Sequence, residues 1–522
     1  MRVLSFKPGH DGAIAILDNG RLLLSLEAEQ DSFPRHNNVT PNTILSAMSY
    51  LDEVPEVVAI SGWVKGYNSV ERPLGAGYFG FDERAISTRR VKYLGKETDF
   101  FTSSHERSHL LCAYGMSPFE QGEPCYVLLW EGILGDFYEI DSNVKVTKLG
   151  KVIEEPGNKY SFLFSLADPT FPLLKGLFLF ENAGKLMALA GFSDYVPMTS
   201  EERAVTEYIL DHVLLLQNEK TDLKWSRFYN IGVEHPEFKN LAGKFSNALF
   251  DRFYEFAKVH LTKKLPLLII GGCGLNCDWN TKWRETGLFP SIFVPPCTND
   301  SGSAIGTAID AQFYYTGNAK LSWDVYAGED FVHDIEPLSD EFEISPLDYQ
   351  QVATFLLKQR VIAWVQGKCE IGPRALGNRS ILAAPFEKQM NSRLNQIKQR
   401  EEYRPIAPVC LEEDVSQHFE WTGPSPYMLY FQKLKTDRLP AVTHVDNTAR
   451  LQTVNATQNG ELYALLTAFK KLTGFGVLCN TSLNFKGRGF INSMSDLIEY
   501  CKDQSLDGFV VQDKFYVPRQ NL

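Results

Sequence analysis

The chain begins MRVLSFKPGHDGAIAILDNGRLLLSLE (residues 1–27), and this stretch is the strongest indication of its fold. Apolar runs at 2–6, 12–17 and 21–27 predict three short strands. Asp18-Asn19-Gly20 joins the last two strands, and Asn-Gly is typical of a tight β-hairpin turn. Gly9-His-Asp-Gly12 joins the first two. The chain therefore opens with a predicted strand-turn-strand-turn-strand unit.

Strands and helices alternate along the rest of the chain, which predicts an α/β fold class. An all-apolar strand at 265–272 ends in Gly-Gly, as expected of a buried strand that opens into a ligand loop. The polar, acidic stretch 317–347 predicts a linker, so we expect two domains, 1–335 and 345–522. The other predicted strands are 56–61, 125–130, 361–366, 476–480 and 507–512, and the predicted helices are 41–51, 303–315, 348–358, 461–472 and 494–502.

Composition limits the partners and the compartment. The net charge of −12 over 522 residues argues against broad, non-specific binding of nucleic acid. One basic run at 84–96, with Tyr93 inside it, predicts a surface segment, and a nucleic-acid contact there is the minor alternative. No run of 18 apolar residues predicts a membrane helix, and the N-terminus does not resemble a secretion signal. Nine cysteines without paired spacing fit reduced thiols and a cytoplasmic location.

Basic residues gather in GPRALGNRS (372–380) and KQREEYRP (398–405). Guanidinium groups bind oxyanions through forked hydrogen bonds, and glycine lets backbone N–H groups approach an anion. The stretch therefore predicts a pocket for a small phosphate-bearing compound; a solvated helix face is less consistent with the Gly-Pro and Arg-Pro breaks. Arg450 and the segment Asn480-Thr-Ser482 follow apolar runs, where α/β domains place ligand contacts. The candidate anion-binding residues are Arg374, Arg379, Lys398, Arg404, Arg450 and Ser482.

Two histidines at i and i+4, His105 and His109, would lie on one face of a helix and could chelate a metal. Asp300, in a polar turn that opens the next helix, is the candidate third ligand. A helix N-terminus at Gly302 also offers N–H groups to phosphate oxygens. Surface or capping histidines, and an N-cap role for Asp300, are the alternatives.

Three further positions are candidates for nucleotide or proton chemistry. His10, in the first turn, is a candidate general base because its pKa lies near neutrality. Gly271-Gly272 follows a strand, and Lys185 lies among glycines in ENAGKLMALAG (181–191), so each could approach a nucleotide. An ordinary turn histidine, a tight turn and a glycine-capped helix are the respective alternatives.

Together these segments resemble the NodU/CmcH-type O-carbamoyltransferases, in the family's order and over nearly the whole chain. The resemblance implies an actin/hexokinase-like (ASKHA) duplicated domain, related to tRNA threonylcarbamoyl transferases, followed by a YrdC-like α/β domain. The matching motifs are Gly-His-Asp, His-x-x-x-His, Gly-Gly-x-x-Leu-Asn-Cys at 271–277, Asp-Ser-Gly-Ser-Ala-Ile-Gly at 300–306, Gly-Pro-Arg-Ala-Leu-Gly-Asn-Arg-Ser at 372–380, Lys-x-Arg-Glu-x-x-Arg-Pro at 398–405, Thr-His-Val-Asp at 443–446 and Asn-Thr-Ser-x-Asn at 480–484.

The resemblance also implies a reaction. Carbamoyl phosphate loses phosphate in the second domain, the resulting carbamate attacks the α-phosphate of ATP, and carbamoyladenylate passes its carbamoyl group to a hydroxyl. His105, His109 and Asp300 would hold Fe²⁺ or Mn²⁺, with Mg²⁺ accompanying ATP. Lys398 and Arg374 would act on carbamoyl phosphate, and His10 on the acceptor hydroxyl. The implied adenylate contacts are Gly271, Gly272, Asn276 and Gly302.

The chain departs from the family in places, and these leave alternatives open. Glu131 stands where the family usually has Asp, so it is the candidate fourth metal ligand. Near the N-terminus the family has acidic residues followed by basic ones, and this chain alters that pattern, with Arg35-His36 downstream. The acceptor substrate could therefore differ from those of the family. The expected acceptor is a small-molecule hydroxyl on a natural product, sugar or nucleoside; the runner-up is a hydroxymethylated pyrimidine, as a nucleotide or in DNA. A metabolite kinase of the same superfamily, or a non-catalytic nucleotide-binding regulator, are rival functions, and a homodimer is one option for assembly.

Overall fold

The computed structural model describes residues 1–65, 72–172, 179–212 and 220–519, and its fold is mixed α/β, as predicted. The chain forms two compact units. The first comprises residues 1–121, 295–443 and 447–522, and the second comprises 122–294 and 444–446. None of the described helices is long and apolar enough to cross a membrane.

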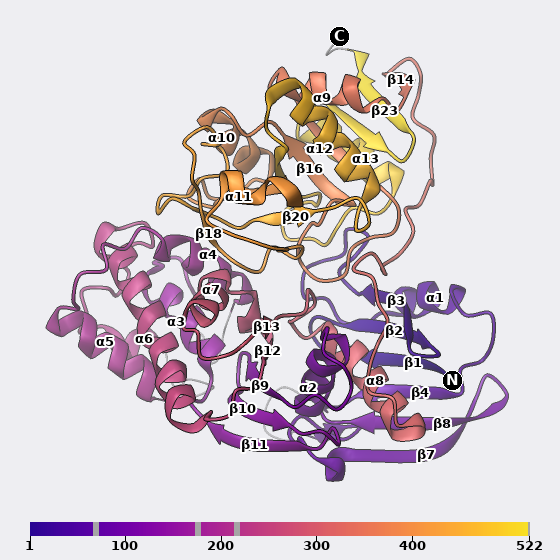
Figure 1. The fold of residues 1–522 in the computed structure, drawn as a ribbon, viewed down its shortest axis with the longest axis vertical. Helices are drawn as coiled ribbons and strands as arrows, with labels where there is room; N and C mark the ends of the chain where they lie inside the picture. Colours follow the sequence, from indigo (N-terminus) through magenta and orange to yellow (C-terminus); the bar gives the residue numbers. More distant parts are fainter. Residues whose placement is uncertain (66–71, 173–178, 213–219, 520–522) are drawn as a thin grey trace. The chain divides into compact units, whose positions relative to one another are not determined.

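The first unit contains a six-stranded sheet in the order β3-β2-β1-β4-β8-β7 (Figure 1). The predicted opening strands and their turn are confirmed: Asn19 and Gly20 have φ of 48° and 82°, the left-handed values that a tight hairpin turn requires. Strands β1, β4 and β8 run parallel, and β2, β3 and β7 run antiparallel to their neighbours. The strands are β1 (Arg2–Lys7), β2 (Ala13–Asp18), β3 (Arg21–Glu27), β4 (Val57–Ser61), β7 (Ile86–Tyr93) and β8 (Lys96–Ser103).

Three helices belong to this sheet: α1 (Pro41–Ser49), α2 (His105–Met116) and α8 (Gly302–Thr316). Helix α8 packs against β1, β2, β4 and α2, although nearly 200 residues of chain separate the two helices. The two helices approach closely because Gly306 has no side chain; a Cβ there would lie 1.8 Å from the Ser108 carbonyl oxygen. The basic run at 84–96 forms edge strand β7 with exposed side chains, which confirms its predicted surface position.

The first unit also contains an eight-stranded sheet in the order β14-β23-β22-β15-β16-β21-β17-β20. Helices α9 (Tyr349–Leu357) and α12 (Gly460–Thr473) share one apolar core with it, and α10 (Lys388–Ile397) and α13 (Met494–Asp503) share another. The strands are β14 (Phe342–Pro346), β15 (Val361–Val365), β16 (Arg379–Ala383), β17 (Ala407–Leu411), β20 (Gln452–Val454), β21 (Val477–Ser482), β22 (Gly508–Val511) and β23 (Lys514–Pro518).

Strand β15 shows why helices cover both faces of this sheet. Val361, Ala363 and Val365 belong to one core, while Ile362 and Trp364 belong to the other. Because successive side chains of a strand point to opposite faces, an all-apolar strand requires cover on both sides. The sequence predicted β15, β21 and β22, at 361–366, 476–480 and 507–512, but not β16 or β17.

The predicted linker at 317–347 is structured for part of its length. Its end forms β14, which pairs antiparallel with β23 at the sheet edge. Further back, the Ser322 and Ala327 carbonyls accept hydrogen bonds from the N–H groups of Leu22 and Ser25 on β3. The six- and eight-stranded sheets therefore belong to the same compact unit, whereas the division into domains 1–335 and 345–522 stays a prediction.

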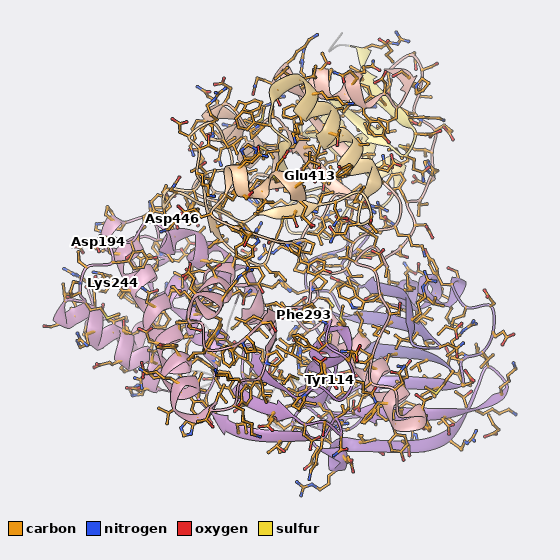
Figure 2. The ribbon with its side chains drawn as sticks, viewed as in Figure 1. Tyr114, Asp194, Lys244, Phe293, Glu413 and Asp446 are labelled. Atoms are coloured by element: carbon orange, nitrogen blue, oxygen red, sulfur yellow. The ribbon has the colours of Figure 1, made fainter. Side chains whose placement is uncertain are left out.

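The second unit has a five-stranded sheet in the order β11-β10-β9-β12-β13 and a group of helices. The predicted strand at 125–130 is confirmed as β9 (Cys125–Trp130), and the strand at 265–272 is shorter, as β12 (Leu267–Ile270). Buried Lys244 pairs with Glu202 at 2.9 Å and with Asp194 at 3.7 Å. Lys244 and Asp194 are labelled in Figure 2. The remaining elements are β10 (Gly135–Ile140), β11 (Val146–Lys151), β13 (Ile292–Phe293), α3 (Pro156–Ala167), α4 (Phe180–Ala190), α5 (Ser200–Asp211), α6 (Pro236–His260) and α7 (Cys277–Glu285).

Candidate functional site

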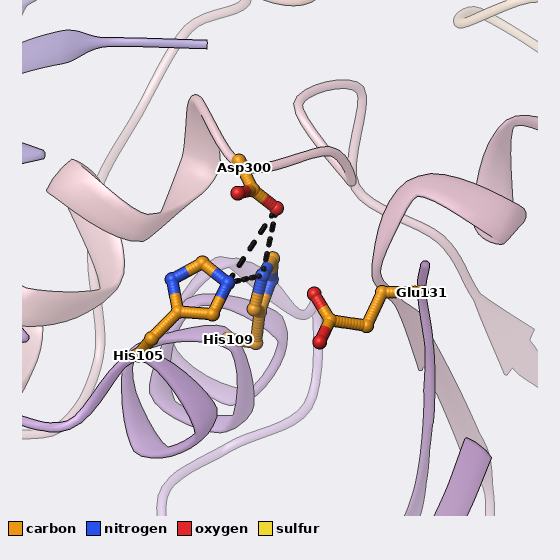
Figure 3. Close-up of side chains that lie close together, drawn as sticks. All are labelled: His105, His109, Glu131 and Asp300. Carbon is orange, nitrogen blue, oxygen red and sulfur yellow. Dashed lines mark hydrogen bonds and ion pairs between the residues drawn. The ribbon is translucent and has the colours of Figure 1, made fainter. Parts of the chain in front are cut away.

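The paired histidines lie in the first turns of helix α2. Ser104 caps this helix, its side chain accepting a hydrogen bond from the Arg107 N–H at 3.1 Å. The i, i+4 spacing places His105 and His109 on one face, with their Nε2 atoms 3.2 Å apart (Figure 3). Both side chains are fully buried. The structure thus confirms that the segment is helical.

Asp300, in the turn before α8, faces both imidazoles. Its Oδ1 lies 3.6 Å from Nε2 of His105 and 3.3 Å from Nε2 of His109 (Figure 3). Ligand atoms about 2.1 Å from one metal ion lie about 3.0–3.4 Å from each other in tetrahedral or octahedral geometry. The separations of 3.2 and 3.3 Å lie in this range and the third, 3.6 Å, is slightly longer, so the three atoms could hold a single divalent ion.

Lys7 on β1 places a positive charge beside the carboxylate of Asp300. The sequence analysis did not point to this residue. Its Nζ lies 3.1 Å from Oδ2 of Asp300, and its side chain is fully buried. Burial alone would raise the pKa of Asp300, but the charges of Lys7, His105 and His10 hold that pKa well below its usual value. Asp300 is thus ionised and ready to bind a cation. A lysine two residues before the Gly-His-Asp-Gly turn was the available signal.

Glu131, the candidate fourth ligand, follows β9 in the second unit and is buried. It is drawn with the two histidines and Asp300 in Figure 3. Its part in metal binding stays a prediction.

His10 lies in the turn between β1 and β2. Its Nδ1 is 3.6 Å from a carboxylate oxygen of Asp11 and 3.7 Å from one of Asp300. The indole of Trp63 packs edge-on against the rings of His10 and His105, at centroid distances of 5.2 and 4.9 Å. Gly9 is required here, because a Cβ would lie 2.5 Å from that indole. The structure thus brings His10 to the edge of the His105/His109/Asp300 cluster.

The predicted anion-binding residues come from several elements: Lys398 follows α10, Ser482 ends β21, and Arg450 follows a short strand, β19 (Thr448–Ala449). Nζ of Lys398 donates to the Ser482 carbonyl at 2.6 Å and to the Asn484 side chain at 2.6 Å. Arg400 donates to Oδ1 of Asn395 at 2.7 Å. Arg404 lies 3.9 Å from Glu401, a distance that gives little stabilisation at a half-exposed site.

These cations perturb one another, which shows that they share one region. Burial, then the charges of Arg400, Arg35 and Arg404, lowers the pKa of Lys398 well below its usual value. Burial, then Arg404 and Arg450, lowers the pKa of Arg400 to about 9. A cluster of buried like charges disfavours its own ionisation, and a bound anion would reverse that effect. The region is thus suited to a phosphate-bearing ligand.

Arg379 binds groups of the protein itself. It lies on β16, is fully buried, and donates to protein oxygens of Asn492, Gln366, Asn378 and Gly367. Its donors are therefore used inside the protein, and its part in the anion site stays a prediction. Arg374 is half-buried in the loop before β16.

Glu370 organises that same loop and was missed by the sequence analysis. Its Oε1 accepts from the N–H groups of Leu376, Asn378 and Arg379 at 2.6 to 3.3 Å. A carboxylate that accepts several backbone N–H groups fixes a loop in one conformation. Glu370 therefore holds the Gly-Pro-Arg segment in place.

The predicted nucleotide-binding residues are distributed over both units. Gly271 follows β12 with φ of 99°, where a Cβ would lie 2.4 Å from the Trp130 carbonyl oxygen, and Asn276 caps α7. Gly302 begins α8, and Gly272 follows Gly271. Lys185 lies on α4 and pairs with Glu181 one turn earlier at 2.8 Å, an ordinary helix ion pair.

A mixed α/β fold that carries a buried histidine–aspartate cluster and a separate cationic cluster fits a group-transferring enzyme. The chain belongs to the carbamoyltransferase family: residues 77–309 match the model described as "Carbamoyltransferase N-terminus", and residues 353–518 match "Carbamoyltransferase C-terminus". It is a transferase.

The comparison with individual relatives extends over the full chain. The chain is 48% identical over 517 residues to 3'-hydroxymethylcephem-O-carbamoyltransferase of Streptomyces clavuligerus, covering 99% of both chains, and equally similar to the Amycolatopsis lactamdurans protein of that name. It is 31% identical to nodulation protein U of Sinorhizobium fredii (strain NBRC 101917 / NGR234), covering 96% of both.

Two solved structures resemble the chain distantly. Full-length HypF in a phosphate- and nucleotide-bound form aligns with 35% of this chain and 23% of its own, at 14% identity and a TM-score of 0.23. A ROK family glucokinase from Streptomyces griseus aligns with 59% of this chain and 98% of its own, at 13% identity and a TM-score of 0.29. At these scores neither likeness carries an argument about function.

Proposed function

We propose that this protein is an ATP- and carbamoyl-phosphate-dependent O-carbamoyltransferase that modifies the hydroxymethyl group of a cephem-type small molecule. The observation that carries the proposal is the 48% identity, over 99% of both chains, to two enzymes named for that reaction. The runner-up acceptor, a hydroxymethylated pyrimidine, gains no support from the described residues.

Carbamoyl phosphate would bind at the cationic cluster. Lys398, Arg404, Arg374 and Arg450 would provide ammonium and guanidinium groups for its phosphate oxygens. Lys398 is already oriented by Ser482 and Asn484. A bound anion would favour the positively charged forms of these side chains. The cluster would therefore hold the phosphate as it separates from the carbamoyl group.

The adenylate would be formed and used with help from the N-terminal residues of the chain. His105, His109 and Asp300 would hold a divalent metal, whose positive charge would stabilise the charge that develops on phosphate oxygens. Lys7 keeps Asp300 ionised for that purpose. An imidazole beside this cluster would take the proton of the acceptor hydroxyl; the sequence proposes His10. Gly271, Gly272, Asn276 and Gly302 remain the proposed nucleotide contacts.

The test is a reconstituted reaction. The protein is incubated with ATP, carbamoyl phosphate, Fe²⁺ or Mn²⁺ and a 3'-hydroxymethylcephem, and products are separated by mass spectrometry. We expect AMP, pyrophosphate and a product heavier than the acceptor by one carbamoyl group in place of hydrogen. Formation of ADP without a carbamoylated product would contradict the proposal and favour the kinase alternative.

A further inference from the structure

Two cysteines and a methionine bring their sulfur atoms together in the first unit. Sγ of Cys112 lies 3.6 Å from Sδ of Met116, one turn further along α2. Sγ of Cys297, which precedes Asp300 by three residues in the turn before α8, is 3.7 Å from the same Sδ atom. All three residues are buried, with no more than 1% of each exposed. Both thiols therefore direct their S–H groups at one thioether.

A buried thiol of the eight-stranded sheet makes a different kind of contact. Cys479, on β21, donates to the Ala384 carbonyl oxygen at 3.7 Å. The S–H group is a weak donor, and a carbonyl oxygen of the surrounding backbone is a sufficient partner for it. Cys112 and Cys297 instead share a sulfur acceptor, so that three soft ligand atoms face one point.

Helix α8 packs closely against these sulfur atoms. A Cβ on Gly302, the first residue of α8, would lie 3.1 Å from Sγ of Cys112 and 2.1 Å from the Cys297 carbonyl oxygen. One turn further on, a Cβ on Gly306 would lie 2.9 Å from Cβ of Cys112. The N-terminus of a 15-residue helix carries a partial positive charge, which favours an anionic group beside it. The sulfur atoms therefore lie where negative charge is stabilised.

The spacing of the sulfur atoms matches the coordination of one soft metal ion. Sulfur ligands about 2.3 Å from an ion lie about 3.8 Å apart in tetrahedral directions and about 4.0 Å apart in a trigonal plane. The observed separations of 3.6 and 3.7 Å differ from these values by a few tenths of an ångström. Thiolate and thioether ligands favour Cu(I), and three ligands suit it better than Zn²⁺, which takes four in structural sites.

We propose that Cys112, Met116 and Cys297 form a second metal site, separate from the histidine–aspartate cluster, which binds one Cu(I) ion through two thiolates and one thioether. Binding forms three Cu–S bonds and displaces the protons of the two thiols, which pass to water. The occupied site then carries one net negative charge, because two thiolates surround a monovalent cation. The N-terminus of α8 offsets that charge. This inference does not depend on the proposed transfer reaction.

The thiols keep their protons until an ion displaces them. The hydrogen bond with Cys112, and then burial, raises the pKa of the Cys297 thiol well above its usual value. Because the thiolate is the reactive form, a protonated thiol at this position is inert toward oxidants and alkylating reagents. A metal ion, in contrast, deprotonates a thiol that coordinates it. The affinity for Cu(I) should therefore rise with pH, and protons should be released on binding.

The test is an oxygen-free titration of the reduced, full-length protein with Cu(I), in competition with a Cu(I) chelator such as bathocuproine disulfonate. Because the site is buried, each addition is followed until the signal is constant. We expect one Cu(I) ion per chain with the ultraviolet absorption of thiolate-to-Cu(I) charge transfer. Cys112→Ala and Cys297→Ala should each lose this absorption and bind Cu(I) about 100-fold more weakly. Cys479→Ala removes a buried thiol elsewhere in the first unit and should behave as wild type.

A second variant keeps the test valid if the alanine variants do not fold. Met116→Leu replaces the thioether by a side chain of nearly the same volume, so the fold should be retained. It should keep the thiolate absorption but bind Cu(I) about tenfold more weakly. Wild-type absorption and affinity in both cysteine variants would overturn the proposal, as would a wild-type protein that shows no thiolate absorption with Cu(I). His105→Ala should keep the absorption, and its loss there would assign the ion to the histidine–aspartate cluster instead.

Discussion

The two charged clusters of this protein balance their buried charge in opposite ways. At the first, Asp300 is neutralised within the protein by Lys7 at 3.1 Å, so its carboxylate is ionised before any ligand arrives. At the second, Lys398, Arg400 and Arg404 repel one another, and burial lowers the pKa values of Lys398 and Arg400. The first cluster is therefore formed in advance for a cation, whereas the second reaches its favoured charge state only with an anion.

The largest expected effect comes from removing the ammonium of the second cluster. Lys398→Met should lower the rate of carbamoyl-phosphate-dependent pyrophosphate exchange about 1,000-fold, because a desolvated charged partner of the phosphate is worth about 2–5 kcal/mol. The variant relieves buried repulsion but also leaves the Ser482 and Asn484 oxygens without their donor, so the rate is compared among folded molecules. Lys502→Met, at an exposed lysine of α13, is the control. Normal exchange in Lys398→Met would remove this lysine from the anion site.

The next prediction separates Arg379 from its neighbours in that cluster. Arg379→Met should destabilise the protein by about 3 kcal/mol, because it leaves Asn492 and several buried carbonyl groups without their donor. Denaturant unfolding measures the loss. Among the molecules that remain folded, the KM for carbamoyl phosphate should be unchanged. A large rise in KM with normal stability would instead place Arg379 in the anion site.

At the first cluster, removing one imidazole should weaken metal binding without unfolding the protein. His105→Ala should lower the affinity for Fe²⁺ or Mn²⁺ about 100-fold, since loss of a neighbour that merely orients a ligand already costs 10–100-fold. Metal content after dialysis against a chelator measures this directly. His260→Ala, at an exposed histidine of α6, should retain the wild-type content. Equal metal in both variants would exclude His105 as a ligand.

The smallest effect concerns Glu27, at the end of β3, whose Oε1 accepts from the Gly372 N–H in the basic loop. Burial, and then the charge of Glu29, raises the pKa of Glu27 to about 8. The folded state thus holds a proton that the unfolded state releases near pH 4.5, so stability falls as pH rises from there to about 8. Glu27→Gln keeps the acceptor oxygen but has no carboxyl group to ionise. Its free energy of unfolding should therefore fall by about 2 kcal/mol less than that of wild type as the pH rises to 8. Parallel pH profiles of unfolding for both proteins would contradict it.

Much of the candidate site was predictable because its signals are local. The His105/His109 spacing needs only one helix, and the Gly-Pro-Arg and Lys-x-Arg stretches carry their charge within a few residues of each other. Asp300 was the candidate third ligand because it lies in a polar turn that opens a helix, and the structure brings the three residues together. The sequence could not show that buried protein oxygens accept the hydrogen bonds of Arg379, because charge in a sequence does not reveal its partners.

The sequence by itself determined the three opening strands and their turn, since side-chain alternation, Asn-Gly and apolar runs act over a few residues. Only the tertiary structure decided which charges meet. Lys7 reaches Asp300, Asp11 reaches His36, and Glu27 reaches Gly372, across separations of up to 345 residues along the chain. Such contacts depend on how sheets and helices pack, and burial together with the neighbouring charges sets the charge state of each group.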